Sequence, residues 1–301
     1  MQMKDEWGTE LKTNKDRVSV IIPTLNAGAE IVRLLDALDT QSLRPDEVIV
    51  IDSHSDDDTL AYVRQFSWVT VMEIERSSFD HGGTRHQALM ASSGDFVLFL
   101  TQDALPEGSD YVASLLEPFA DPDVAMVYGR QLPKPDARRF EQLVREFNYP
   151  KQSTIREESD IDSLGIKAFF ASDVCSAYRR SHYLAVDGFP RPCNTNEDML
   201  IAAKILRDSK KIAYAADARV FHSHNLTPAE QFRRNREVGI FLARNGDYFD
   251  GVSEVSEGGT LVRQISRTLL SEKRVGEFLA FGVDCGARLI GNRYGRLVAS
   301  R

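Results

Sequence analysis

Polar and charged side chains recur at four places where a run of apolar residues ends. They are Thr24 and Asn26 after the first run, Asp52 after the second, His81 and Arg85 after the third, and Gln102 and Asp103 after the fourth. In an open α/β sheet, ligands bind at the carboxyl ends of the parallel strands, so we expect these side chains to line one crevice. Acidic and hydroxyl residues also cap helices. Helix capping explains the polar residues at one of these strand ends, which we call exits, more easily than those at all four.

The known nucleotide-binding loops are missing from these exits. The first exit contains no G-x-G-x-x-G, and no G-x-x-x-x-G-K-[ST] occurs in the chain. A diphosphate in the crevice would therefore be held by a metal ion and by Arg85, which we expect in the first turn of a helix. Gly82 and Gly83 are expected to let the backbone pass close to the ligand.

The apolar runs themselves predict an α/β fold with a mostly parallel central sheet. Predicted strands are Val18–Pro23, Glu47–Asp52, Val69–Ile74 and Phe96–Thr101, and predicted helices are Ile31–Leu38, Leu60–Phe66 and Thr84–Ala91. Continuous β-branched runs are typical of strands buried on both faces. Strands that alternate with helices at this pitch indicate βαβ units, with helices on both faces of the sheet.

The pattern loosens after about residue 130. It predicts an amphipathic helix at Arg138–Phe147, strand-like pieces at Ala168–Phe170 and Ser176–Arg179, a loop at Gly188–Glu197, and helices at Asp198–Arg207 and from Pro228 to about Arg244. Proline suits the first turn of a helix, which places the start of the last one.

Composition narrows the function classes. The chain has 301 residues and a net charge of −8, which argues against a general nucleic-acid binder. Its three cysteines are widely spaced and give no disulfide or metal framework, so we expect a cytoplasmic location. Residues 1–16 are expected to form a polar leader without an apolar signal region, and no stretch reaches the ~18–20 apolar residues of a spanning helix.

Residues 261–301 carry eight basic and three acidic residues, a net charge of +5 in a chain that is acidic overall. Apolar residues recur there at helical spacing, namely Leu261, Ile265, Leu269, Leu270, Phe278, Phe281 and Cys285. Two interpretations remain open. This tail is an amphipathic segment that lies peripherally on the cytoplasmic face of the inner membrane, or it is a helical pair that packs on the catalytic domain and can form a homodimer contact.

Several motifs carry a resemblance to a known family. Val18–Asn26 (VSVIIPTLN), Val48–Thr59 (VIVIDSHSDDDT) and the acidic exit at Asp103 resemble family 2 glycosyltransferases of the GT-A fold. Phe79–Arg85 (FDHGGTR), Thr101–Ala104 (TQDA) and Asn196–Met199 (NEDM) resemble, more narrowly, the bacterial rhamnosyltransferases of that family.

This resemblance extends from about residue 17 to about residue 245 and implies an organisation. Residues 17–130 would be the half that binds the nucleotide sugar. Residues 131–225 would be the acceptor-binding and catalytic half of the same domain, and residues 226–301 a C-terminal helical region.

The resemblance also implies how the donor is held. Thr24 and Asp52 would grip the base and ribose, with Asn26 and Gln102 beside them. The family's D-x-D motif binds Mg²⁺ or Mn²⁺ on the donor diphosphate, but Asp103 is the only carboxylate of this motif here. A further ligand would be His224 or His222; the alternative is a pair of surface or core histidines.

Further roles follow from the same resemblance. Asp198 would be the catalytic base of an inverting transfer, although it is equally placed to begin a helix. Arg234, in a Q-x-x-R segment, would help to hold the diphosphate; the alternative is a solvated helix face. His81 is expected to contact the donor sugar.

The function implied is transfer of L-rhamnose from dTDP-β-L-rhamnose to a hydroxyl of a cell-surface polysaccharide or a lipid-linked glycan precursor. One alternative keeps the chemistry with another donor, a UDP-hexose or UDP-N-acetylhexosamine. A sugar nucleotidyltransferase would need a glycine-rich basic loop that Pro23–Gly28 does not supply. An inactive nucleotide-sugar-binding protein would not need Asp52, Asp103 and Asp198.

Overall fold

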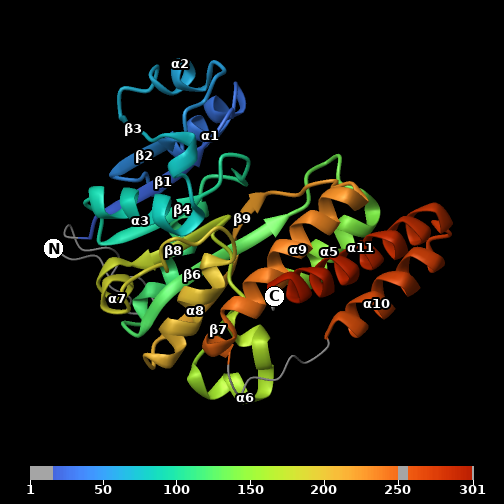
Figure 1. Ribbon diagram of the computed structural model, residues 1–301. Coiled ribbons are helices and arrows are strands. Elements are labelled where there is room, and N and C mark those ends of the chain that lie inside the picture. The colour runs from blue at the N-terminus through green and yellow to red at the C-terminus, as the bar shows by residue number, and fades with distance from the viewer. Residues whose placement is uncertain (1–15, 250–256, 300–301) are drawn as a thin grey trace, which may run out of the picture.

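A central mixed sheet of nine strands carries helices on both faces in the computed structural model, which describes residues 16–249 and 257–299 (Figure 1). The strands are β1 Val18–Thr24, β2 Glu47–Asp52, β3 Val69–Glu73, β4 Phe96–Leu100, β5 Leu105–Pro106, β6 Val124–Leu132, β7 Thr154–Arg156, β8 Cys175–Arg179 and β9 Lys211–Phe221. Their order is β3-β2-β1-β4-β8-β6-β9-β5, and β7 pairs with β9. The α/β class predicted from the sequence is therefore confirmed.

The first four strands form the parallel part of the sheet that the sequence predicts. β8 runs antiparallel to β4 and β6, while β6 and β9 are parallel to each other. The helices are α1 Glu30–Asp39, α2 Thr59–Val63, α3 His81–Ala91, α4 Tyr111–Leu116, α5 Arg139–Asn148, α6 Ile161–Leu164, α7 Arg180–Ala185, α8 Glu197–Arg207, α9 Pro228–Arg244, α10 Glu257–Ser271 and α11 Val275–Ala299.

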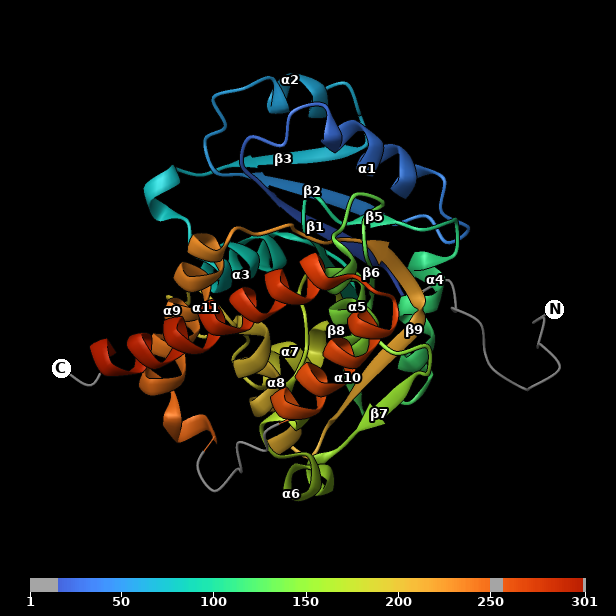
Figure 2. The ribbon, with the colours of Figure 1, turned by 90° about the vertical axis from the view of Figure 1, so that its right-hand side faces the viewer.

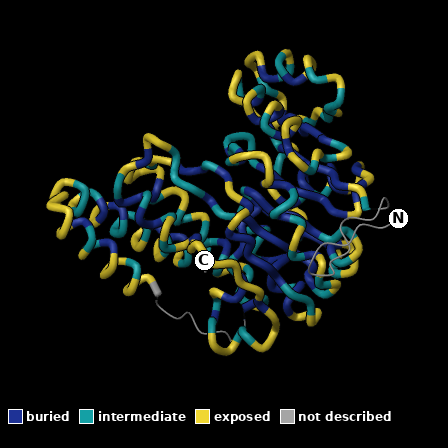
Figure 3. Tube along the Cα trace, turned by 180° about the vertical axis from the view of Figure 1, so that it is seen from behind, coloured by how far each residue is buried: buried dark blue, intermediate teal, exposed yellow. Residues whose placement is uncertain are grey.

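Residues of β1 alternate between two apolar cores, one on each face of the sheet. Val20 and Ile22 pack with residues of α1 and α4, and Ile21 packs on the opposite side with residues of α3 and α8. Both sets are fully buried, and the central strands appear dark blue in Figure 3. Burial on both faces explains why these strands are continuous apolar runs in the sequence.

The strand predicted at Ala168–Phe170 is wrong, because residues 165–169 form a short 3₁₀ helix. The buried guanidinium of Arg156 accounts for this difference. It donates to the carbonyl oxygens of Lys167, Ala168 and Phe170 at 2.8, 2.7 and 2.5 Å, which curls the chain around it. A buried cation needs such acceptors. The strand predicted at 176–179 is confirmed as part of β8.

α3 begins three residues earlier than predicted, at His81, with the side chain of Asp80 as its N-cap. Arg85 therefore lies beyond the first turn, not in it. The expectation that Gly82 and Gly83 admit a ligand is also wrong. A Cβ atom at Gly82 would lie 2.6 Å from the carbonyl oxygen of Pro190, and one at Gly83 would strike the Asp80 carboxylate. These glycines let α3 pack against its own cap and the loop before α8.

Three glycines bring α9 and α11 into backbone contact where the two helices run together (Figure 2). A Cβ atom at Gly239 would lie 2.2 Å from the carbonyl oxygen of Asn292. At Gly291 it would lie 2.5 Å from the carbonyl oxygen of Phe232, and Gly295 meets the backbone at Arg236. Larger side chains would force these helices apart.

The apolar positions predicted in the tail mostly face the protein. Ile265, Leu269 and Phe281 are buried against Phe140 and other residues of α5, with Leu261, Phe278 and Cys285 partly buried beside them. Leu270, in contrast, is 50% exposed. The predicted leader falls outside the described residues except for Asp16. In the described parts of the chain, no helix combines the length and apolar character needed to cross a bilayer.

Candidate active site

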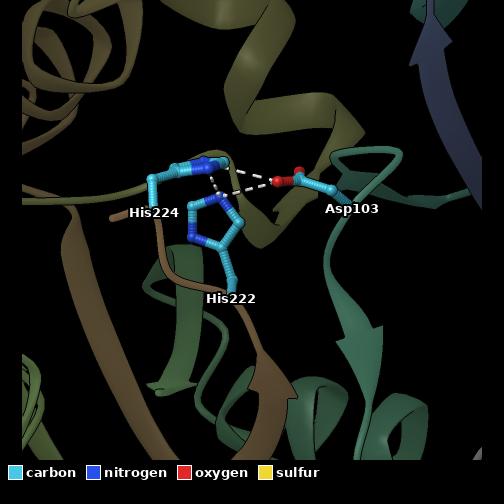
Figure 4. Close-up of side chains that lie close together, drawn as sticks. All are labelled: Asp103, His222 and His224. Atoms are coloured by element: carbon cyan, nitrogen blue, oxygen red, sulfur yellow. Dashed lines mark hydrogen bonds and ion pairs between the residues drawn. The ribbon is translucent and has the colours of Figure 1, made fainter. Parts of the chain in front are cut away.

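Asp103, His222 and His224 converge on one point (Figure 4). One carboxylate oxygen of Asp103, Oδ2, lies 3.3 Å from His224 Nε2 and 3.6 Å from His222 Nε2, and the two Nε2 atoms are 3.1 Å apart. One carboxylate oxygen and two imidazole nitrogens that face each other are a ligand set that could hold a divalent metal ion.

The sheet brings these three residues together although they are far apart in the sequence. β5 pairs antiparallel with the end of β9, with Leu105 opposite Phe221, so that Asp103 and His222 flank the same short ladder. The backbone N–H of His222 also donates to the carbonyl of Leu132 at 2.9 Å. The exit of the fourth strand is thereby fixed beside the exit of the last.

A hydrogen bond to Gln131 fixes the orientation of His222. Nδ1 of His222 lies 2.9 Å from the side-chain oxygen of Gln131, which also accepts a hydrogen bond from Arg145. An amide oxygen only accepts, so Nδ1 carries the proton and the lone pair of Nε2 faces Asp103. Burial lowers the pKa of His222 to about 3. The imidazole is therefore neutral at physiological pH, as a metal ligand must be.

Electrostatics also keep Asp103 ionised. Burial opposes its charge, but His222 and His224, which carry charge only in the acid range where Asp103 itself titrates, and Lys134 outweigh that effect. Together they hold the pKa of Asp103 below its usual range, so the carboxylate is already ionised at the higher pH where the imidazoles are neutral. Lys134 Nζ lies 3.8 Å from Asp103 Oδ2. The residues present fit the divalent metal that the sequence predicts.

The exits of the first two strands form a hydrogen-bonded unit. Thr24 Oγ1 and Ser55 Oγ each donate to Asp52 Oδ2 at 2.7 Å, and Asn26 Oδ1 accepts from the N–H of Asp56 at 3.0 Å. Asp52 is completely buried, whereas Asn26 is exposed. Asp52 therefore holds the two exit loops together, and Asn26 adopts a left-handed conformation with φ of 51°.

Gln102 links the exits of the first and fourth strands. Its side-chain oxygen accepts from the N–H of Leu25 at 2.8 Å, and its amide nitrogen donates to the Leu25 carbonyl at 3.1 Å. The paired contact fixes the loop that carries Asp103 against the first strand's exit. A glutamine here supplies both a donor and an acceptor, which aspartate does not.

Three carboxylates and one arginine surround the start of α8. Arg85 Nη1 pairs with Glu197 Oε1 at 2.8 Å, and both side chains are buried. Asp198 lies in the first turn, and its Oδ2 accepts from the N–H of Asp173 at 3.4 Å. Burial and the neighbouring charges of Glu197 and Asp173 raise the pKa of Asp198 well above its usual range. Burial likewise raises the pKa of Asp173 to about 6.

Other predicted residues lie in distinct places. His81 is exposed beside this cluster, with Nδ1 3.1 Å from Arg85 Nη1. Arg234 lines a cavity with Arg145 and Arg288 that adjoins His224. The structure thus places the predicted residues in four groups: the candidate metal triad (Asp103, His222 and His224), a pair of exit loops, a carboxylate cluster and this cavity.

Sequence reasoning missed Gln131, Asp173, Arg145 and Arg288. Asp173 was recognisable in part, since it precedes a strand that the sequence predicts. The contacts of Gln131, Arg145 and Arg288 depend on tertiary packing, and the sequence carries no signal for them.

Comparison with known proteins identifies the family. The model described as glycosyl transferase family 2 matches residues 19–185. The chain belongs to this family. It is a glycosyltransferase, as the sequence predicts.

Two curated relatives are similar over most of their length. The chain is 42% identical to the O-antigen chain rhamnosyltransferase RfbN of Salmonella typhimurium over 228 residues, which are 75% of this chain and 73% of the relative. It is 43% identical to the O-antigen chain rhamnosyltransferase WbaN of Salmonella anatum over 229 residues, which are 75% of this chain and 72% of that relative.

Solved structures share the fold. The mannosyltransferase PcManGT from Pyrobaculum calidifontis, in complex with GDP-Man and Mn²⁺, aligns with a TM-score of 0.66 at 20% identity over 96% of this chain and 89% of that one. Glucosyl-3-phosphoglycerate synthase from Mycobacterium tuberculosis, in a complex that includes Mn²⁺ and UDP, aligns with a TM-score of 0.54. The identity is 21%, and the alignment covers 77% of this chain and 81% of that one. The predicted GT-A type of fold is confirmed.

Proposed function

We propose that this glycosyltransferase moves L-rhamnose from dTDP-β-L-rhamnose onto a hydroxyl of a cell-surface polysaccharide or lipid-linked glycan precursor. The observation that carries the proposal is the 42–43% identity to two O-antigen chain rhamnosyltransferases, which spans the metal triad and the start of α8. The reaction would be a single displacement at the anomeric carbon, with inversion of its configuration.

The donor would lie across the exits of the parallel strands, in residues 17–130. Asn26 and the backbone of the two exit loops would contact the nucleoside, with Thr24 and Asp52 as the buried support that holds those loops in place. Gln102 would act in the same way for the loop of Asp103. His81 stays the proposed contact with the donor sugar. Residues 131–225 would form the acceptor side.

Asp103, His222 and His224 would hold Mn²⁺ or Mg²⁺ on the donor diphosphate. Two imidazole nitrogens favour Mn²⁺, because Mg²⁺ prefers oxygen ligands and retains its waters. A metal bound there neutralises the charge that develops on the departing diphosphate. Mn²⁺ in the two solved glycosyltransferases of this fold is consistent with the assignment.

Asp198 would be the base. As the acceptor oxygen bonds to the anomeric carbon and the bond from that carbon to the phosphate oxygen breaks, the acceptor hydroxyl proton passes to the Asp198 carboxylate. Burial and the neighbouring carboxylates raise its pKa, and a raised pKa makes the ionised carboxylate a stronger base. Arg85 would position this carboxylate by fixing Glu197, its neighbour in the first turn of α8.

The donor specificity is tested by a screen of nucleotide sugars. With dTDP-rhamnose, UDP-glucose, UDP-galactose and UDP-N-acetylglucosamine offered at equal concentration with Mn²⁺, we expect the largest release of nucleotide diphosphate from dTDP-rhamnose. Omission of the enzyme and addition of excess EDTA are the controls. A clear preference for a UDP-sugar would overturn the rhamnose assignment and leave the family and the site intact.

The outer face of α11 is suited to contact with a membrane surface. Opposite its packed side it exposes a row of large apolar residues, Val275, Leu279, Val283, Leu289, Ile290, Tyr294, Leu297 and Val298, each at least 39% exposed. Arg293 on this face and Arg263, Arg267, Lys273 and Arg274 on α10 and the following turn are exposed too. We propose that this face rests on an anionic leaflet, where each basic residue contributes about 1 kcal/mol.

Co-flotation with anionic vesicles tests this surface. We expect the intact protein to float with the vesicles, less so at high salt, and the double variant Leu279→Gln/Ile290→Gln to stay at the bottom of the gradient. Met90→Gln, which changes another apolar residue that is more than half exposed and lies on α3, is the matched control. Absence of flotation combined with a doubled mass in solution, lost in the double variant, would assign the face to a homodimer instead.

A further inference from the structure

A cavity of about 280 Å³ lies between α5, α9 and α11 and adjoins the metal triad at His224. Its polar lining includes three arginines, one from each helix, namely Arg145, Arg234 and Arg288. This volume is many times what a single water molecule needs, so the cavity has room for a phosphate or diphosphate group. The two carboxylates that line it, Glu141 and Asp284, balance only two of these arginines.

Both carboxylates are already paired inside their own helices. Glu141 contacts Nε of Arg145 at 3.0 Å, and Asp284 contacts Nε of Arg288 at 2.7 Å. Asp284 also accepts from the side-chain amide of Gln231 at 3.0 Å. Each of these pairs uses the Nε atom of its arginine. The Nη groups of Arg288 form no hydrogen bond with any residue that the structure describes, so they remain as donors for a ligand.

Arg234 is left without a partner. It makes no hydrogen bond or ion pair with any residue that the structure describes, although it lines the same cavity. The guanidinium keeps access to solvent but sits in a concave site, so that partial desolvation and then the nearby charges of Arg145 and Arg288 lower the pKa of Arg234. Three clustered cations with one unmatched charge form a site that an anion stabilises.

We propose that this cavity binds a phosphate or diphosphate group of the acceptor substrate. The cavity is lined by α5, α9, α11, Phe170 and residues 224–226, and by none of the strand exits at Thr24, Asn26 and Asp52 where the nucleoside is proposed to lie. His224 is shared with the metal triad, so an anion held here places the rest of the acceptor at the reacting centre. This inference rests on the proposed glycosyl transfer and reassigns Arg234 from the donor diphosphate to the acceptor.

The test is equilibrium binding by calorimetry, with inorganic pyrophosphate as the probe and the full-length protein in EDTA, where the metal-dependent donor site is inactive. We expect the wild-type protein to bind pyrophosphate, and Arg234→Ala and Arg288→Ala each to weaken that binding about tenfold or more, the worth of one hydrogen bond to a charged group. Arg233→Ala, an exposed arginine on α9 that does not line the cavity, is the matched control and should bind as wild type.

A second arm separates the two sources of phosphate. With Mn²⁺ present, Arg234→Ala and Arg288→Ala should bind dTDP and UDP as the wild type does. Loss of nucleotide binding that parallels the loss of pyrophosphate binding would assign the cavity to the donor and overturn the proposal, as would unchanged pyrophosphate binding in both variants. Neither arm uses a donor sugar, so the outcome is independent of whether rhamnose is transferred.

Stability provides a check on folding. Because Arg234 has no partner among the described residues and faces two other cations, Arg234→Ala should melt no lower than wild type. Arg288→Ala removes a partner of the buried Asp284, so Arg288→Lys is included as the variant that keeps the charge. A lower melting temperature of Arg234→Ala would show that its role is structural and would contradict the proposed site.

Discussion

Asp103→Ala is expected to reduce sugar transfer by about 10³-fold or more, which corresponds to several kcal/mol of stabilisation of the developing diphosphate charge. The variant removes the only carboxylate of the triad and leaves two neutral imidazoles, which bind a hard cation less well. Release of nucleotide diphosphate from the donor measures the loss. Titration of Mn²⁺ into the protein should show that its binding is weakened in parallel.

Two comparisons make this result specific to a metal site. In Mn²⁺, Asp103→Ala should lose affinity for nucleotide diphosphate, whereas in EDTA it should bind as weakly as the wild type does. His222→Ala and His224→Ala should lose activity to a smaller extent. Asp217→Ala, an exposed carboxylate on β9, should be unaffected. Full activity of Asp103→Ala, or of the wild type in excess EDTA, would contradict the assignment.

Asp198→Asn is expected to lower kcat by ~10²–10⁴, the usual contribution of a positioned general base, with nearly unchanged affinity for the donor. Asparagine keeps the size of the side chain and can still accept a hydrogen bond at Oδ1, but it cannot take a proton. Single-turnover rates and donor binding, measured on the same preparation, separate the two effects. A collapse of affinity with surviving turnover would make Asp198 a binding residue.

The same cluster predicts a pH dependence. A base acts only when deprotonated, so kcat/KM should rise with pH through the pKa of Asp198, and that pKa lies well above the ordinary value of about 4. Asp173 is one of the charges that raise it. Asp173→Asn should therefore shift the rising limb to lower pH while transfer continues. If the rising part of the kcat/KM profile stays at the same pH in Asp173→Asn, the cluster does not set the pKa of the base.

The parallel half of the fold was predictable because its strands are buried on both faces. Continuous β-branched runs such as Val18–Pro23 leave few alternatives to a buried strand. Because the carboxyl ends of parallel strands meet at one edge of the sheet, Thr24, Asp52 and Asp103 are then expected at that edge. The resemblance also implied His224 or His222 as a further metal ligand. Their convergence on Asp103 was a prediction from resemblance and residue chemistry, and the geometry is consistent with it.

Other features were not predictable because they depend on contacts between distant segments. The glycines at 82 and 83 look like ligand-binding glycines, yet they accommodate Pro190 and Asp80. Residues 168–170 are apolar enough for a strand, but the buried Arg156 recruits their carbonyl groups. The three-arginine cavity requires α9 and α11 to touch through glycines far apart in sequence, and no local pattern reports such a contact.

The short ladder between β5 and β9 has a consequence for how the molecule folds. Asp103 lies after the fourth strand, and the two histidines lie after the last long strand, β9. The three side chains therefore come together only when β5 has paired with β9. Closing so long a loop is entropically costly and comes late along most folding routes. A divalent ion held by the proposed ligands would bind only the completed sheet, and at a hundred times its dissociation constant it would add about 2.7 kcal/mol to the stability of that state. The cation would thus act as a reporter of correct assembly as well as a cofactor.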